Sequence, residues 1–170
     1  MNRILRHGFL LALVIITLAG FGCAKKEVTD PQGSGGGQIY DGDELPLTEQ
    51  ERQAAMRISN GVIYFAYDSY TLDTTAKSIL TQSAEIIRQF PTLRVTIEGH
   101  CDERGTEEYN LALGERRARA AYDFLLNLGI SSSQLEMVSF GKLHPAVQGG
   151  GESAWSKNRR DEFKVYKPRN

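Results

Sequence analysis

The sequence has few of the residues from which catalytic and metal sites are usually built. Its 170 residues include two cysteines and three histidines. Past the N-terminal segment, the histidines are His100 and His144. His100 is followed directly by Cys101, Asp102 and Glu103, and in an extended chain such neighbours point to opposite sides, which makes a poor zinc site. Because no nucleophile and base are evident, we expect neither an enzyme nor a bound metal ion or other cofactor.

The charge balance lacks an excess of either sign. There are 20 basic and 21 acidic side chains, with a formal net charge of −1. Loss of residues 1–22, which hold Arg3 and Arg6 and no acid, would leave 18 basic and 21 acidic side chains. This balance favours neither a nucleic-acid partner nor a polybasic membrane patch. The length and the hydrophobic content of 41% suit one domain of ordinary size with tails.

The long hydrophobic run of the chain lies near the N-terminus. Arg3 and Arg6 precede an apolar segment over 9–19, which small residues and Cys23 follow. This order is typical of a bacterial export signal. The uncharged stretch over 8–24 falls short of the ~18–20 apolar residues that a membrane-spanning helix needs. We therefore expect the residues before Cys23 to form a cleaved signal peptide.

Cys23, directly after Gly22, resembles the lipobox of bacterial lipoproteins, in which the cysteine is acylated and becomes the new N-terminus. Ala24 stands where an aspartate would, in enteric bacteria, retain a lipoprotein at the inner membrane. The resemblance implies lipidation at Cys23 and an anchor in the outer membrane. The alternative for an exported chain is a disulfide between Cys23 and Cys101.

Composition changes again after the cysteine. Residues 23–46 contain the glycine-rich run 33–37 and show no apolar periodicity, which is typical of a flexible tether. Residues 47–170 are expected to form the globular domain. At its start, Thr48 and Glu51 are spaced as a capping box for a short helix.

Within the domain, strand and helix patterns alternate. The expected elements are a buried strand over 62–67, a helix capped by Asp73 that ends before Pro91, a strand over 94–99, a helix capped by Thr106, a strand over 135–140, a short helix over 152–159 and a last strand over 161–166. This order predicts an α+β fold. Its β-α-β-α-β core would gain a closing strand, giving a mixed sheet with helices packed on one face.

The run from 99 to 118 places charges at a strand end beside a helix. Asp102 lies just past the strand end. One face of the helix carries residues that recur at the spacing of helical neighbours: Thr106, Asn110, Leu113, Gly114 and Arg117. We expect a groove floored by Gly114, with Arg117 at its far end and Asp102 at its mouth.

These two charges suit a small zwitterion. A guanidinium binds a carboxylate through two parallel hydrogen bonds, and an aspartate accepts from an ammonium. Arg117 and Asp102 could thus hold the α-carboxylate and α-amino group of one amino acid, such as the diaminopimelate of a peptidoglycan stem peptide. The alternative is a structural ion pair between the two side chains.

The same run resembles the peptidoglycan-associated lipoproteins, called Pal, within the larger family that shares the OmpA-type C-terminal domain. Their pattern Gly-His-x-Asp, then Asn-x-x-Leu-x-x-x-Arg-Ala, is matched by Gly99, His100, Asp102, Asn110, Leu113, Arg117 and Ala118. The resemblance implies an OmpA C-terminal-like fold in which Asp102 and Arg117 hold diaminopimelate.

The resemblance runs from about Val62 to Tyr166. It implies that Tyr67 and Asp68 line the same pocket, although Tyr67 could instead cover the rim of the core. It also implies one arginine at the pocket edge just before the last strand, which we take as Arg160. The alternative there is a salt-bridged helix end.

The function that follows from the resemblance is a non-covalent tether between the outer membrane and the cell wall. The protein would be a lipid-anchored outer-membrane protein on the periplasmic side, with the peptidoglycan stem peptide as ligand. The family also implies TolB and the Tol complex as partners in envelope integrity and cell division. The alternatives are an ion-motor stator, which would need a retained membrane helix, and a cell-wall hydrolase.

Overall fold

The structure, a computed structural model, describes residues 44–169. The predicted signal peptide, Cys23 and most of the predicted tether lie outside this range, so those boundaries stay predictions. In chain order the elements are α1 (Glu49–Ser59), β1 (Ile63–Tyr64), α2 (Thr74–Gln89), β2 (Arg94–His100), α3 (Glu107–Asn127), a short 3-10 helix η1 (Ser132–Gln134), β3 (Leu135–Gly141), α4 (Glu152–Asn158) and β4 (Arg160–Tyr166). Among the described helices, none is long and apolar enough to cross a membrane.

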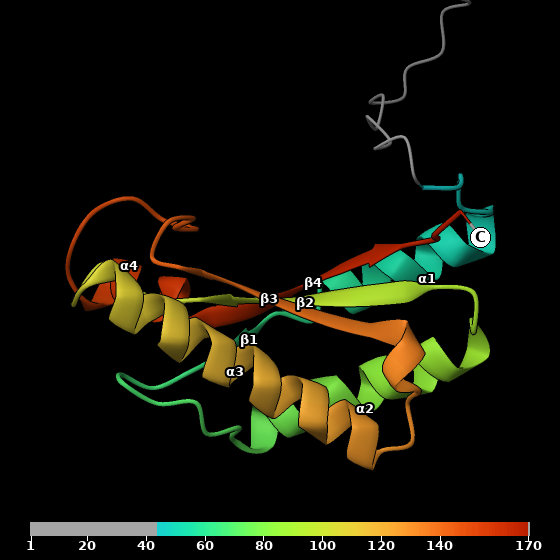
Figure 1. The fold of residues 1–170 in the computed structure, drawn as a ribbon, viewed down its shortest axis with the longest axis horizontal. Coiled ribbons are helices and arrows are strands. Elements are labelled where there is room, and N and C mark those ends of the chain that lie inside the picture. Colours follow the sequence, from blue (N-terminus) through green and yellow to red (C-terminus); the bar gives the residue numbers. More distant parts are fainter. Residues whose placement is uncertain (1–43, 170) are drawn as a thin grey trace, which may run out of the picture. The chain divides into compact units, whose positions relative to one another are not determined.

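The four strands form one mixed sheet in the order β1-β4-β2-β3. Strand β3 runs parallel to β2, whereas β4 runs antiparallel to both β2 and β1. Helices α2 and α3 lie on the same side of this sheet (Figure 1). The predicted α+β fold with a closing strand is therefore confirmed.

The first strand is much shorter than predicted. A buried strand was expected over 62–67, but only Ile63 and Tyr64 pair with β4, at the edge of the sheet. Ile63 is fully buried, and Tyr64 is 52% exposed, because alternate residues of an edge strand point to the core and to solvent. The chain then turns at Asp68, which adopts a positive φ of 50°. This early exit carries the following segment toward the end of β2.

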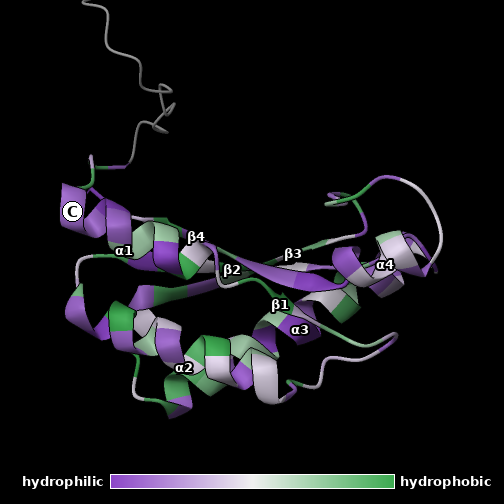
Figure 2. Cartoon of the chain, turned by 180° about the vertical axis from the view of Figure 1, so that it is seen from behind, coloured by the Kyte–Doolittle hydropathy of each residue, from purple (hydrophilic) through white to green (hydrophobic). Residues whose placement is uncertain are grey.

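The helix starts follow the capping residues read from the sequence. Thr48 and Glu51 form the expected capping box of α1, and the side chains of Asp73 and Thr106 accept from the backbone of Ala76 and Tyr109. Each satisfies a backbone donor that the first helical turn leaves free. Hydrophobic and hydrophilic residues alternate around α1 and α2, as the mixed green and purple of Figure 2 shows.

The two faces of the sheet differ in chemistry. Under α2 and α3 the apolar core gathers alternate strand residues, among them Val95, Ile97 and Phe163. The opposite face is polar: Glu136 accepts hydrogen bonds from Thr96 and from Tyr166. The continuous apolar core on one side of the sheet therefore stabilises the fold. The ends of the strands can carry functional groups.

Candidate functional site

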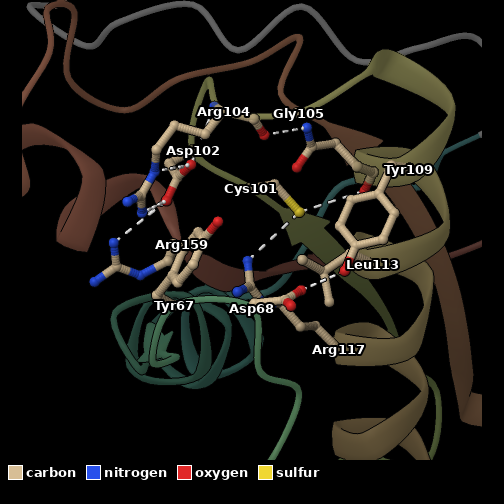
Figure 3. A pocket seen from close by; sticks show the side chains of 11 residues that line it. Tyr67, Asp68, Cys101, Asp102, Arg104, Gly105, Tyr109, Leu113, Arg117 and Arg159 are labelled. Carbon is tan, nitrogen blue, oxygen red and sulfur yellow. Dashed lines mark hydrogen bonds and ion pairs between the residues drawn. The ribbon is translucent and has the colours of Figure 1, made fainter.

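A pocket of about 280 Å³ lies where β2 ends, beside the first half of α3 and the segment that follows β1 (Figure 3). Its lining consists of Tyr67, Asp68, Cys101, Asp102, Arg104, Gly105, Tyr109, Asn110, Leu113, Arg117 and Arg159. Six of the eight binding residues predicted from the sequence are in this set. The structure thus brings together segments that are up to 92 positions apart, from Tyr67 to Arg159.

Asp102 is buried and held by two arginines. Arg104 donates from Nε to Oδ1 at 3.0 Å and from Nη2 to Oδ2 at 2.5 Å, and Arg159 Nη1 lies 3.3 Å from Oδ2. Burial acts to raise the pKa of Asp102, but the bonds from Arg104 and Arg159 outweigh it and hold the pKa below its usual value. Asp102 is therefore an anion at neutral pH.

Arg104 forms a cover over this carboxylate. Its guanidinium carbon lies 4.0 Å from the ring centres of both Tyr67 and Trp155, which hold it between two aromatic faces. The Trp155 ring is fixed in turn, because its Nε1 donates to Glu103 at 2.9 Å. Arg104 and Trp155 were not predicted as site residues. The signal for Arg104 was its place two residues after Asp102 in the same loop.

Arg117 is completely buried, and its described polar contacts are with backbone carbonyls and one thiol rather than with a carboxylate. Nε donates to Ser69 O at 2.8 Å, Nη1 to His100 O at 2.8 Å and Nη2 to Ala66 O at 3.2 Å. In Figure 3 no ion pair joins it to Asp102. The two charges line one pocket without neutralising each other directly, so the simple ion-pair alternative does not describe this site.

A second buried carboxylate lies near Arg117. Asp161, at the start of β4, is fully buried, and neither of its oxygens has a hydrogen-bond partner among the described residues. Burial raises its pKa well above the usual value, and the charges of Arg117 and Arg160 oppose this shift in part. Burial also lowers the pKa of Arg117. Burial of these two ionisable groups beside the pocket therefore costs free energy.

The remaining predicted pocket residues set its walls. Asn110 is buried, and its amide donates to the carbonyls of Arg104 and Thr106 at 2.8 and 2.9 Å, so it fixes the loop that carries Asp102. Leu113 gives an apolar surface. Asp68 accepts a hydrogen bond from Tyr109, and Tyr67 is 62% exposed at the pocket rim rather than packed over the core.

The predicted role of Gly114 as the floor of the ligand groove is wrong. A Cβ at this position would lie 2.3 Å from Ser139 Oγ and 2.9 Å from Gly99 O, so Gly114 faces the sheet and not the pocket. The missing side chain allows α3 to approach the backbones of β2 and β3 closely. The sequence spacing correctly placed these residues on one face of the helix. Gly114, however, lies at the edge of that face that contacts the sheet.

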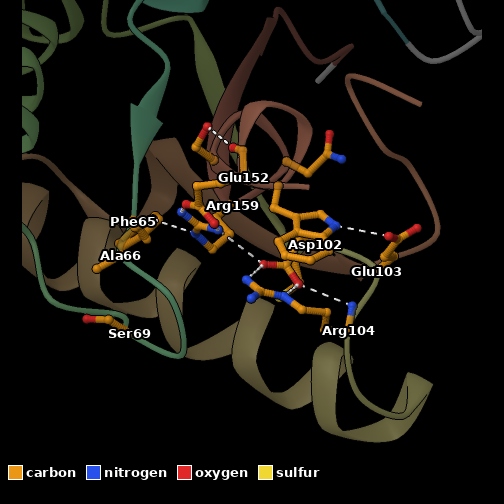
Figure 4. Close-up of polar contacts among 12 residues, drawn as sticks. Phe65, Ala66, Ser69, Asp102, Glu103, Arg104, Glu152 and Arg159 are labelled. Carbon is orange, nitrogen blue, oxygen red and sulfur yellow. Dashed lines mark hydrogen bonds and ion pairs between the residues drawn. The ribbon is translucent and has the colours of Figure 1, made fainter. Parts of the chain in front are cut away.

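The arginine at the pocket is Arg159, so the placement of Arg160 there needs correction. Arg159 Nε donates to Phe65 O at 3.0 Å, and the same guanidinium contacts Asp102 and Glu152 (Figure 4). Arg160 points away and donates to Glu162 Oε1 at 2.6 Å. Arg159 is the C-cap of α4 and Arg160 is the first residue of β4, so the two neighbouring side chains lie in different surroundings.

Cys101 is a free, buried thiol in the pocket wall. Its Sγ lies 3.3 Å from Asn110 O, and burial raises its pKa to about 11. The thiol is therefore protonated at neutral pH and acts as a small packed side chain. The partner in the alternative disulfide, Cys23, lies outside the described residues.

Comparisons with known proteins identify relatives of this chain and structures of similar fold. The OmpA family profile matches residues 64–159. The peptidoglycan-associated lipoprotein of Rhizobium meliloti is 38% identical over 94% of this chain and 88% of its own length. A crystal structure of the peptidoglycan-associated lipoprotein from Burkholderia pseudomallei superposes with a TM-score of 0.60 at 40% identity, over 61% of this chain and 88% of that one. The C-terminal domain of Helicobacter pylori MotB has a TM-score of 0.55 at 20% identity, covering 61% of this chain and 83% of that chain, which is a similarity of fold alone.

Proposed function

The chain belongs to the OmpA family and, within it, to the peptidoglycan-associated lipoproteins, and from this premise we propose that its pocket binds the diaminopimelate of a peptidoglycan stem peptide. Membership makes the chain a peptidoglycan-binding lipoprotein of the cell envelope and not an enzyme.

The observation that carries the proposal is the separation of charge inside one pocket. Asp102 and Arg117 both line it, both are buried, and no ion pair connects them among the residues described. A ligand that presents an ammonium and a carboxylate on one carbon complements both charges at once. A neutral or singly charged group would use at most one of these two charges and would bind with lower affinity.

Each end of the zwitterion has a defined place. The ammonium would replace Arg104 at the Asp102 carboxylate, because both are cations that donate to the same oxygens. The carboxylate would meet Nη2 of Arg117, whose one described contact is the 3.2 Å bond to Ala66 O. The Arg117 guanidinium already donates to three backbone carbonyls. It would therefore bind the ligand carboxylate through its charge and the remaining donor capacity of Nη2, and not through the two parallel hydrogen bonds that the sequence suggested.

Binding of the full-length protein, solubilised in detergent, to purified sacculi tests the proposal. Asp102→Asn and Arg117→Met should each weaken binding by ~30-fold or more, since each removes the charge that matches one end of the ligand, at a cost of about 2–5 kcal/mol. Asp123→Asn and Arg116→Met remove exposed charges on α3 and serve as matched controls. Folded Asp102 and Arg117 variants that bind as well as these controls would overturn the assignment.

The anchor and the partner complete the proposed role. We propose that Cys23 is acylated and holds the domain at the periplasmic side of the outer membrane, and that TolB and the Tol complex are partners, as the family resemblance implies. Mass spectrometry of the extracted protein should give a lipidated Cys23 as the N-terminal residue, and an intact segment before it would contradict the anchor. Copurification of TolB with the parent chain would support the partner.

A further inference from the structure

A second cluster of ionisable side chains lies on the polar face of the sheet, away from the pocket. Glu98 and His100 belong to β2, and Glu162 belongs to β4, where it pairs directly with Glu98. One ligand atom from each of the three lies within 4.8 Å of the other two. The neighbours of His100 along the chain make a poor metal site, whereas the sheet adds a carboxylate from 62 positions away.

His100 is the unusual member of this cluster. It is 3% exposed, and neither ring nitrogen has a hydrogen-bond partner among the described residues. A buried polar group without a partner is costly and calls for an explanation, such as a water or an ion. Its Nε2 lies 3.9 Å from Glu98 Oε2, so the ring is directed toward the carboxylates.

A cation already occupies the space between the two carboxylates. The Lys164 ammonium lies 3.1 Å from Glu162 Oε2 and 4.0 Å from Glu98 Oε2. Its side chain is 58% exposed and can swing into solvent. The second oxygen of Glu162 accepts from Arg160 at 2.6 Å, which orients this carboxylate. The cluster therefore has the charge pattern of a cation site whose present occupant is replaceable.

We propose that Glu98, His100 and Glu162 bind a divalent metal ion of the zinc type, with the Lys164 ammonium displaced. Zinc accepts imidazole nitrogen and carboxylate oxygen together, at about 2.0–2.2 Å, and uses three protein ligands plus water in open sites. Such distances require ligand atoms to lie ~3.3 Å apart, so the side chains must close in by about 1 Å or more, which glutamate rotamers permit. Calcium and magnesium prefer oxygen alone and would not use the imidazole.

Calorimetric titration of the full-length protein with zinc chloride tests this site, with magnesium chloride as the comparison ion. Glu162→Gln should weaken zinc binding by tenfold or more, whereas Glu85→Gln, an exposed change on α2, should leave it unchanged. Lys164→Met should strengthen zinc binding several-fold because the competing ammonium is gone. Lys77→Met is the matched exposed control.

Two results would overturn the proposal. One is the absence of a zinc signal above that of magnesium. The other is equal zinc affinity in the Glu162→Gln and Glu85→Gln proteins, which would place the ion elsewhere, for example on a cysteine. His100→Gln adds a direct test of the imidazole, and circular dichroism identifies a variant that has lost its fold. Sacculus binding need not change in any of these variants, so this site and the proposed function fail independently.

Discussion

The two halves of α3 bury the same side of one helix with opposite chemistry. The first half buries Asn110 and Arg117 at the pocket, and the second half buries Ala121 and Leu125 in the apolar core. Burial of apolar surface stabilises the fold, whereas burial of charge costs free energy unless each group is bonded. The apolar half therefore supplies the stability that keeps Arg117 buried without a carboxylate partner among the described residues.

The largest expected effect is in the apolar half. Leu125→Ala should lower the free energy of unfolding by ~2–5 kcal/mol, because Leu125 is fully buried in the core cluster and its removal leaves a cavity. Urea unfolding measures the loss. Leu143→Ala, at a residue that is 53% exposed, should change stability by less than about 0.5 kcal/mol. Similar losses at the two leucines would refute the assigned core.

The contact between α3 and the sheet gives the next effect. Gly114→Ala should destabilise the domain by ~1–3 kcal/mol, because the new Cβ would press on Ser139 and on the Gly99 carbonyl. At an exposed helix position the same exchange would be stabilising by about 1 kcal/mol. Ala112→Gly, on the exposed side of α3, is the control that measures the ordinary difference in helix propensity between alanine and glycine. A more stable Gly114→Ala protein would mean that the helix is less close to the sheet than described.

A smaller effect is expected at Arg104, which covers the Asp102 carboxylate in the loop before α3. Arg104→Ala should strengthen binding of the stem peptide by up to ~10-fold, because the ligand ammonium no longer competes with Arg104 for Asp102. Calorimetry measures the affinity. A weaker complex would show instead that Arg104 contacts the ligand directly.

The last effect is a change of pH dependence. The pKa of Asp161 is raised in the folded state. Protonation of Asp161 therefore favours the folded state, and this contribution to stability is fully present below the usual carboxyl pKa. It is lost as the pH rises through the raised pKa. Asp161→Asn should remove this fall in stability with rising pH. Thermal melts across acidic and neutral pH compare the two proteins, and parallel curves would contradict the assignment.

Much of the fold could be predicted from the sequence, because its signals are local. Capping residues and apolar periodicity are read within one turn or strand, which is why the starts of α1, α2 and α3 were predicted correctly. The first strand was overestimated, because its apolar run does not reveal that it lies at a sheet edge.

The site was predictable only in part. Asp102 and Arg117 belong to one short run, and both reach the pocket. The errors at Gly114 and Arg160 have a common cause: which neighbouring residue faces the pocket depends on how α3 packs on the sheet and on where β4 begins. Arg159 contacts Asp102 across 57 positions, which a pattern within one segment cannot indicate.

The most direct test of the central claim compares two stem peptides that differ in one residue. Calorimetric titration of the full-length protein would use a peptide with diaminopimelate and one with lysine, which lacks the second α-carboxylate. Burial of Arg117 without a carboxylate partner among the described residues predicts that the lysine peptide binds ~30-fold or more weakly. Equal affinity for both peptides would contradict the claim that the polar half of α3 recognises a zwitterion.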